Sequence, residues 1–159
     1  MKLEVRMLQA QHQTSVLDIM AKHEFQFPSF IREQYPSRWR SFLEEKEKSK
    51  SCYLVMIDDD ENVIGHAGYI LREVTNLFEI VGVATRNDQV RKGIGSLLIT
   101  TICKKVGELG HKEIVLHTLD HEQNQAALAF YERLGFRRIN LEMDYYFAGY
   151  HRLTLLKSL

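Results

Sequence analysis

The stretch that most constrains this chain is Gln89-Val90-Arg91-Lys92-Gly93-Ile94-Gly95-Ser96. It follows an apolar run, residues 77–84, and precedes an amphipathic run, residues 97–109. This order predicts a strand, a glycine-rich turn and a helix. Glycines let such a turn present successive N–H groups to one point, and the helix start adds more N–H groups and the positive end of its dipole. The pattern favours a diphosphate cradle, although the same turn also occurs as a plain tight connection. The cradle residues are Arg91, Lys92, Gly93, Ile94, Gly95 and Ser96.

The spacing of the glycines excludes two common nucleotide motifs. A phosphate-binding loop of the Walker type needs Gly-x-x-x-x-Gly-Lys-Ser/Thr, which is absent. The dinucleotide fingerprint Gly-x-Gly-x-x-Gly needs a third glycine where this chain has Leu98.

A second segment, residues 124–136, reads Asn-x-x-Ala-x-x-Phe-Tyr-x-x-x-Gly-Phe. Together, and in this order, the two segments resemble the GNAT superfamily of acetyl-coenzyme A-dependent N-acetyltransferases. The resemblance is close over residues 77–136 and extends in outline to the whole chain. One position departs from the family pattern, because Val90 stands where the family usually carries Gln or Arg. The family's contacts there are largely backbone N–H groups, so we expect cofactor binding to persist, while the side chain that contacts phosphate stays open.

Composition bounds the kind of protein. The chain has 159 residues, 45% hydrophobic content and no net charge, which suits one domain over residues 1–159 with a substantial core. We expect no nucleic-acid partner, no membrane partner and a cytoplasmic location. Cys52 and Cys103 lie in apolar segments, which favours buried reduced thiols. The seven histidines lack metal-ligand spacing, so we expect no metal.

Hydrophobic periodicity predicts an α/β fold, with a mixed central sheet of about seven strands flanked by helices. The four acidic residues within 58–62 could suggest a metal loop, but they fit a hairpin tip better. The expected strands cover residues 3–8, 52–57, 63–71, 77–84, 113–118, 137–147 and 151–157, and the expected helices cover 13–25, 38–48, 96–109 and 124–134.

The resemblance implies where the cofactor lies. In the GNAT fold the fourth and fifth strands splay apart, and the pantetheine arm enters the gap and pairs with the free strand edge. Carried over to this chain, the edge is Val83, Ala84 and Thr85, and the N–H of Val83 becomes the donor to the developing oxyanion. Asn124 is implied to bind the pantetheine arm, and its position also predicts a helix N-cap.

Glu79 is the candidate base. At pH 7 the neutral form of a lysine-type amine costs about 4.6 kcal/mol, so a base near the acyl carbon lowers the barrier. Glu79 is a carboxylate within an apolar strand, where burial favours a role near neutrality. The histone-acetylating branch of the family carries its catalytic glutamate at a similar distance from the cradle. The alternatives are an exposed edge glutamate, a glutamate paired with an arginine, or a base that is a water chain ending at His117 or His66.

Tyr131 is the candidate acid. It lies in the second motif, where many family members use this tyrosine to protonate the departing thiolate, and we also assign it to the cofactor site. Its alternative is a core tyrosine, because Phe130, Tyr131 and Leu134 could form an apolar helix stripe.

The acceptor is expected to meet an aromatic wall, by stacking or cation–π contact. Glu142 and Asp144 could attract its charge. The run Asp144-Tyr145-Tyr146 loosely resembles the Asn-Tyr-Tyr of enzymes that acetylate protein N-termini. Ordinary packing of these aromatics is the alternative. The candidate acceptor residues are Phe27, Tyr35, Trp39, Tyr145 and Tyr146, and Phe25, Phe30 and Tyr150 belong to the same segments.

Two functions from different classes follow. The first is an N-acetyltransferase that moves the acetyl group of acetyl-coenzyme A to a primary amine, by direct attack in a ternary complex. Its acceptor is either a small-molecule amine or a protein N-terminus, and a homodimer is possible. The second is a non-catalytic acetyl-coenzyme A-binding module that regulates a partner. Glu79 and Tyr131 discriminate between them, since a pure binding module needs neither.

Overall fold

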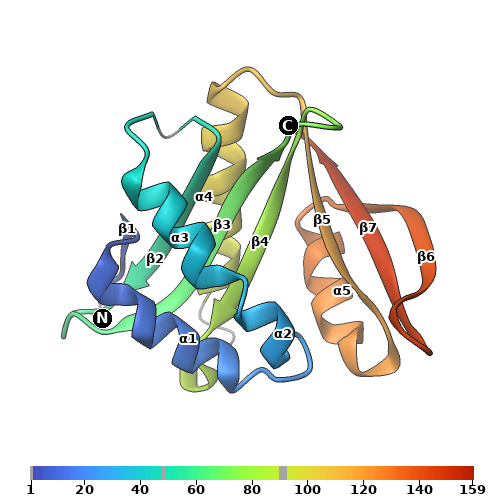
Figure 1. The fold of residues 1–159 in the computed structure, drawn as a ribbon, viewed down its shortest axis with the longest axis horizontal. Coiled ribbons are helices and arrows are strands. Elements are labelled where there is room, and N and C mark those ends of the chain that lie inside the picture. Colours follow the sequence, from blue (N-terminus) through green and yellow to red (C-terminus); the bar gives the residue numbers. More distant parts are fainter. Residues whose placement is uncertain (1, 48, 90–92) are drawn as a thin grey trace.

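The structure is a computed structural model that describes residues 2–47, 49–89 and 93–159 (Figure 1). These residues form one seven-stranded sheet in the order β1-β2-β3-β4-β5-β7-β6. The strands are β1 (Glu4–Met7), β2 (Ser51–Ile57), β3 (Val63–Arg72), β4 (Leu77–Thr85), β5 (Glu113–Asp120), β6 (Arg137–Phe147) and β7 (Tyr150–Ser158). The helices are α1 (Gln13–Ala21), α2 (Ser29–Arg32), α3 (Tyr35–Glu44), α4 (Ile94–Glu108) and α5 (Gln125–Arg133), with short 3-10 turns η1 (Ala10–His12), η2 (Asn87–Gln89) and η3 (Glu122–Asn124).

The sheet is mixed, and its one parallel pair opens the site. All neighbouring strands are antiparallel except β4 and β5. Their ladder joins only Phe78–Ile80 to Ile114–Leu116, although both strands continue further. Figure 1 shows the two strands diverging beyond this ladder. The predicted α/β class and the predicted splay of the fourth and fifth strands are therefore confirmed.

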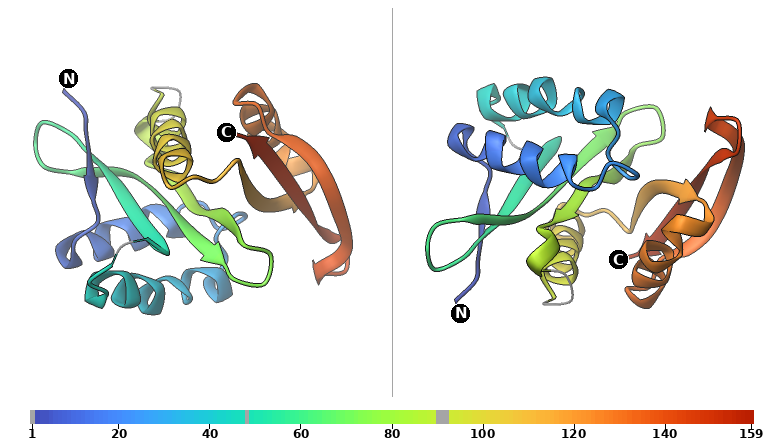
Figure 2. Two further views of the ribbon diagram at one scale, coloured as in Figure 1. Left: turned by 90° about the horizontal axis from the view of Figure 1, so that it is seen from above. Right: turned by 90° about the horizontal axis from the view of Figure 1, so that it is seen from below.

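Helices cover both faces of the sheet (Figure 2). The helices α1, α2 and α3 lie on one face, and α4 and α5 lie on the other. The inward stripe predicted for α4, Leu98, Ile102 and Val106, is fully buried. Because α4 follows β4 directly, packing of this stripe holds the start of α4 near the opening between β4 and β5.

The helices between β1 and β2 differ from the sequence expectation. A helix over residues 38–48 was predicted to begin after Pro36, but α3 runs from Tyr35 to Glu44. Pro36 lies in the first turn of α3, where a missing N–H costs no hydrogen bond and the fixed φ suits a helix. The short helix α2, which follows Pro28, was not predicted.

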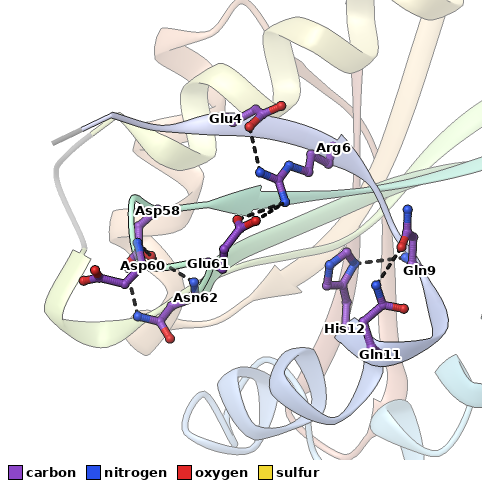
Figure 3. A network of polar contacts seen from close by, with 9 residues as sticks. All are labelled: Glu4, Arg6, Gln9, Gln11, His12, Asp58, Asp60, Glu61 and Asn62. Carbon is purple, nitrogen blue, oxygen red and sulfur yellow. Dashed lines mark hydrogen bonds and ion pairs between the residues drawn. The ribbon is translucent and has the colours of Figure 1, made fainter.

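The tip between β2 and β3 is a hairpin turn, as predicted (Figure 3). A carboxylate oxygen of Asp58 accepts hydrogen bonds from the N–H groups of Asp60 and Asn62, at 3.0 and 2.9 Å. Arg6 of β1 pairs with Glu61 at 3.0 Å and so ties the tip to the sheet edge. Across the described residues, no group of three or more His, Cys, Asp and Glu side chains could hold a metal ion.

Cys52 is buried, Cys103 is half-buried, and neither forms a disulfide within the described part of the chain. Among the helices of the described residues, none combines the length and the apolar character needed to cross a bilayer.

Candidate active site

A cavity of about 780 Å³ opens where β4 and β5 part. Its walls come from the segment after α1, from α2 and the start of α3, from the middle of β4 and the second half of β5, from α5, and from the β6–β7 hairpin. Seven of the predicted functional residues line it together: Phe27, Tyr35, Glu79, Val83, Tyr131, Tyr145 and Tyr146. A candidate base, a candidate acid and the free strand edge therefore face one space.

Glu79 is buried in β4, with 8% of its surface exposed. Its Oε1 accepts a hydrogen bond from Nε of Arg72, on β3, at 2.7 Å. The alternative of an exposed edge glutamate is thus wrong, and the arginine-paired alternative describes one of its contacts. The same Oε1 lies 3.8 Å from Nε2 of His117, on β5. The carboxylate therefore lies between a guanidinium and an imidazole while still lining the cavity.

His117 brings a second titratable group to this wall. Its Nδ1 is 2.9 Å from the hydroxyl of Thr154, on β7, which leaves Nε2 directed to Glu79. Burial lowers the pKa of His117 below its usual 6.5, and the nearby Glu79 carboxylate only partly offsets this. At neutral pH the imidazole is therefore neutral and able to accept a proton.

His66, the other histidine considered as the end of a water chain, does not serve that role. It is fully buried, and both ring nitrogens are engaged. Nε2 accepts from Nε1 of Trp39 at 3.2 Å, and Nδ1 is 2.7 Å from the carbonyl of Gly82. His66 is not among the residues that line the cavity.

Tyr131 lies on α5 and is half-buried. Its ring packs against Phe130 and Phe136, with centroids 5.3 and 6.0 Å away. Burial raises the pKa of the Tyr131 phenol well above its ordinary value of 10. The hydroxyl is thus protonated at neutral pH, and it makes no hydrogen bond to another described residue. Tyr131 is among the residues that line the cavity. This arrangement leaves the O–H free to donate to a bound molecule.

The second half of β4 carries a β-bulge. His66 pairs with Ala84 and Gly68 with Val81, so the strand gains one residue at Gly82. Gly82 has a φ of +67°, and a Cβ there would lie 2.8 Å from the ring of His66. A residue with a side chain would therefore be strained and crowded. The bulge changes the direction of the strand just before Val83, which is half-buried and lines the cavity.

The edge predicted for the pantetheine arm continues from Val83 through Ala84 to Thr85. Ala84 is buried, and the register pairs it with β3. The carbonyl oxygen of Thr85 is 2.7 Å from Nε2 of His23, a residue just after α1. A side chain of the protein thus occupies one acceptor of this edge, while no strand pairs with β4 on its β5 side beyond Ile80 among the described residues.

The predicted diphosphate cradle is described only from Gly93 onward, because Arg91 and Lys92 lie outside the described residues. Gly93 has a φ of +77° at the N-cap of α4, a left-handed conformation that glycine adopts without steric strain. Apart from its own chain neighbours, no atom of the described residues lies within 4 Å of a Cβ built there. The N-cap residue of α4 is Gly93, which has no side chain to accept a hydrogen bond from the first N–H groups of the helix. Exposed N–H groups at the end of a helix, beside open space, suit a phosphate group.

The remaining cradle residues differ in exposure. Ile94 is buried, and Gly95 and Ser96 are half-buried. A Cβ at Gly95 would lie 3.3 Å from the ring of Phe130, so the first turn of α4 faces α5.

Asn124 is buried and holds the loop before α5 together. Its Nδ2 donates to Oγ1 of Thr118 at 2.9 Å and to the carbonyl of Leu119 at 2.7 Å. Its Oδ1 accepts from Nε2 of Gln26 at 3.0 Å. The predicted N-cap hydrogen bond of this side chain is absent, because those partners already use its amide group. Its predicted contact with the pantetheine arm stays a prediction.

The aromatic residues assigned to the acceptor divide into two groups. Phe27, Tyr35, Tyr145 and Tyr146 line the cavity. Trp39 does not: it is 0% exposed and packs against His66 in the core. Tyr35, Trp39 and Phe42 recur at helical spacing on α3 and are all buried, a stripe that predicts core packing.

The acidic residues proposed to attract an amine are occupied within the β6–β7 hairpin. Glu142 pairs with Arg152 at 2.6 Å. Asp144 accepts a hydrogen bond from the N–H of Gly149 at 2.7 Å. The guanidinium carbon of Arg152 also lies 3.8 Å from the centre of the Tyr145 ring, so a cation of the protein already packs against this face of Tyr145. Neither acid lines the cavity.

Comparison with known proteins agrees with this fold. The model of the acetyltransferase (GNAT) family matches residues 17–136. The chain belongs to the GNAT family of acetyltransferases. It is accordingly an N-acetyltransferase by family. No curated protein sequence is significantly similar to it.

Solved structures share the complete GNAT fold at low sequence identity. A GNAT-family acetyltransferase from Desulfovibrio desulfuricans aligns with a TM-score of 0.89 at 18% identity, covering 99% of both chains. The ribosomal-protein-alanine N-acetyltransferase of Escherichia coli aligns at 0.75 and 15%, covering 99% of this chain and 94% of that one. A chimeric spermidine N-acetyltransferase from Vibrio cholerae aligns at 0.78 and 16%, covering 99% and 96%.

Proposed function

We propose that the protein transfers the acetyl group of acetyl-coenzyme A to a primary amine, by direct attack within a ternary complex. The observation that carries this proposal is that Glu79 and Tyr131 line one cavity, at the opening between β4 and β5. A regulatory binding module would need the cofactor site but not two proton-transfer groups around the same space.

The described residues fit the cofactor in two places. The open N-terminus of α4 at Gly93 suits the diphosphate, and the unpaired side of β4 at Val83 suits the pantetheine arm. When bound, acetyl-coenzyme A supplies an activated thioester to this cavity. The carbonyl oxygen of Thr85 is less available to the pantetheine arm than expected, because the side chain of His23 already forms a hydrogen bond with it.

The proton transfers follow from the side chains of the cavity. The amine nitrogen forms the new bond to the acetyl carbon and loses a proton to the Glu79–His117 pair, directly or through one water. The neutral imidazole of His117 and the carboxylate of Glu79 share this work, since their facing atoms lie 3.8 Å apart. Tyr131 donates its proton to the sulfur as the carbon–sulfur bond breaks. The N–H of Val83 stabilises the carbonyl oxygen as negative charge develops on it.

The acceptor is a primary amine of either of two sources. The names of two structural neighbours mention spermidine and a ribosomal-protein alanine, which are a small-molecule amine and a protein amine. The cavity wall of Phe27, Tyr35 and Tyr146 can stack against the carbon skeleton of either. The cytoplasmic location and the absence of a nucleic-acid partner stay predictions from the sequence.

A panel of amines tests the function. The purified protein is incubated with acetyl-coenzyme A and with polyamines, amino acids, simple alkylamines or short peptides, and thiol release and acetylated product are both measured. The proposal expects equal amounts of thiol and acetylated amine with at least one class. Cofactor binding by calorimetry without transfer to any amine would support the regulatory module instead.

A further inference from the structure

Three arginines line the cavity, and they differ in their partners. Arg72 pairs with Glu79 at 2.7 Å, and Arg152 pairs with Glu142 at 2.6 Å. Arg38, on α3, has no carboxylate within ion-pair distance among the described residues. A half-exposed guanidinium that lines a cavity without a counter-ion is a candidate binding group for an anion.

The position of Arg38 is fixed by neutral contacts. Its Nη2 donates to Oε1 of Gln34 at 3.0 Å, one helical turn earlier. Its guanidinium carbon lies 5.2 Å from the centre of the Tyr35 ring, in a cation–π contact. These contacts orient the group without neutralising it, and they leave further N–H donors unused.

Arg38 lies at the same end of the cavity as the candidate base. The ring of Tyr35, over which the Arg38 guanidinium lies, is 3.0 Å from a Cβ built at Gly82, on the same strand as Glu79. The Tyr35 ring, beneath Arg38, packs edge-on against His66, next to the bulge at Gly82.

The other cavity-lining charge without an ion-pair partner among the described residues is Glu24, and it lies elsewhere. Glu24 is exposed in the segment after α1, next to Phe25. The ring of Phe25 packs against His121 and Tyr150, at the far end of β5 and the start of β7. Among the described residues, the cavity thus has one carboxylate without an ion-pair partner, Glu24, on that side and one such cation, Arg38, on the side of Glu79.

We propose that Arg38 is an anion subsite of the acceptor pocket, and that the preferred acceptor is a primary amine that also carries a carboxylate. The inference rests on the acetyl-transfer function proposed above and names its substrate class. The amine lies at Glu79 and His117, and the carboxylate receives N–H donors from Arg38. Such charge-assisted hydrogen bonds discriminate strongly against a ligand that lacks the anion, because the site is partly desolvated.

Matched acceptors test the subsite. One pair is 6-aminohexanoate and hexylamine, which share the amine and the chain and differ in the carboxylate. The second pair is a C-terminally amidated dipeptide with and without an acidic second residue, so that only one member carries a carboxylate. The wild type is expected to show a higher kcat/KM for the acid of each pair. Arg38→Gln is expected to lower kcat/KM by about 10- to 100-fold for the acceptors that carry the carboxylate. For the acceptors that lack it, the loss should be less than about twofold.

Two further variants separate charge from structure. Arg38→Lys keeps the charge but loses the planar fork, so it should restore part of the selectivity. Arg40→Gln changes an exposed arginine of the same helix that does not line the cavity, and it should leave both members of each pair unchanged. A wild-type preference for the acceptors that lack the carboxylate would overturn the proposal. An equal loss of kcat/KM for both members of a pair in Arg38→Gln would also overturn it.

A binding measurement keeps the subsite distinct from the transfer function. Calorimetry with the reaction products, 6-acetamidohexanoate and N-hexylacetamide, requires no turnover. The acid should bind more tightly to the wild type, and Arg38→Gln should abolish the difference. If no amine is acetylated but this difference is present, the transfer function fails while the subsite stands. If amines are acetylated but the difference is absent, the subsite fails alone.

Discussion

Nδ1 of His66 lies 2.7 Å from the carbonyl oxygen of Gly82. The indole N–H of Trp39 can only donate, so Nε2 of His66 accepts from it and Nδ1 carries the ring proton. That proton is donated to Gly82, the residue at the β4 bulge. The buried pair of Trp39 and His66 thus fixes the backbone immediately before Val83, the proposed oxyanion donor. His66 acts on the site through this backbone and does not contact the cavity.

The first prediction concerns stability and pH. Burial lowers the pKa of His66 to about 4, from 6.5 in the unfolded chain. Between these values the unfolded state binds more protons, so this contribution is complete above pH 6.5 and is lost as the pH falls toward 4. The total is about 3 kcal/mol. Urea unfolding of wild type and His66→Gln at pH 7 and pH 4.5 should show a smaller acid loss in the variant.

Other titrating groups are common to both proteins and cancel in this comparison. Equal losses of unfolding free energy in the two proteins would mean that His66 is not held neutral by the fold.

The second prediction concerns the diphosphate. Gly93→Asp should weaken acetyl-coenzyme A binding by about 10- to 100-fold, because a carboxylate would stand against phosphate. Gly93→Asn is the matched control, since Asn and Asp both tolerate the left-handed φ of +77° and have the same shape. Calorimetry on both variants isolates the charge. If Gly93→Asp and Gly93→Asn bind acetyl-coenzyme A with equal affinity, this turn does not hold the diphosphate.

The third prediction concerns Glu79. Activity should rise with pH in the range below 6.5, where the depressed pKa of His117 lies, because the Glu79–His117 pair must be free to take a proton. Glu79→Gln should lower activity and move the acidic limb to lower pH, because the carboxylate that raises the pKa of His117 is gone, whereas His117→Gln should remove the limb. A pH–rate profile with one good acceptor measures both effects.

Arg72→Gln is the control for the third prediction. It removes the 2.7 Å partner of Glu79 while keeping the carboxylate, so it should retain the acidic limb. If Arg72→Gln and Glu79→Gln give the same profile, Glu79 matters as an ion-pair partner and the base lies elsewhere.

The elements were predictable because the strands and α4 have strong periodicity. The expected strand over residues 77–84 is within one residue of β4, and the inward stripe of α4 is buried as expected. The start of α3 was not, because Pro36 was interpreted as an interruption whereas it lies in the first helical turn. Local propensity does not distinguish these two uses of proline.

The residues that line the candidate site were predictable where they stand within motifs. Glu79, Val83 and Tyr131 come together around one cavity, and Gly93 lies at the start of α4. The bulge had a sequence signature as well, since Gly82 is an isolated glycine within an apolar strand.

The contacts that the sequence could not show join residues far apart in the chain. Arg72, His66 and Trp39 contact their partners across different elements, so no local pattern reports them. Trp39 was assigned to the acceptor site because aromatic content alone does not distinguish residues that line a pocket from residues buried in the hydrophobic core. Its spacing with Tyr35 and Phe42 would have placed it in the core.

The last prediction concerns Tyr131. Tyr131→Phe should lower kcat by about 10²- to 10⁴-fold with little change in acetyl-coenzyme A affinity, because the hydroxyl is needed only when charge develops on sulfur. Its ring packs on Phe130 and Phe136, and Phe preserves that packing. Thermal unfolding of the variant checks that the fold is intact.

The most direct test of acetyl transfer follows an isotopically labelled acetyl group from acetyl-coenzyme A, with the best amine of the panel, in wild type and Tyr131→Phe. The account predicts that wild type places the label on the amine at the rate of thiol release, and that Tyr131→Phe slows both together while calorimetry shows unchanged cofactor binding. Label appearing only in free acetate, or equal transfer rates in the two proteins, would contradict it.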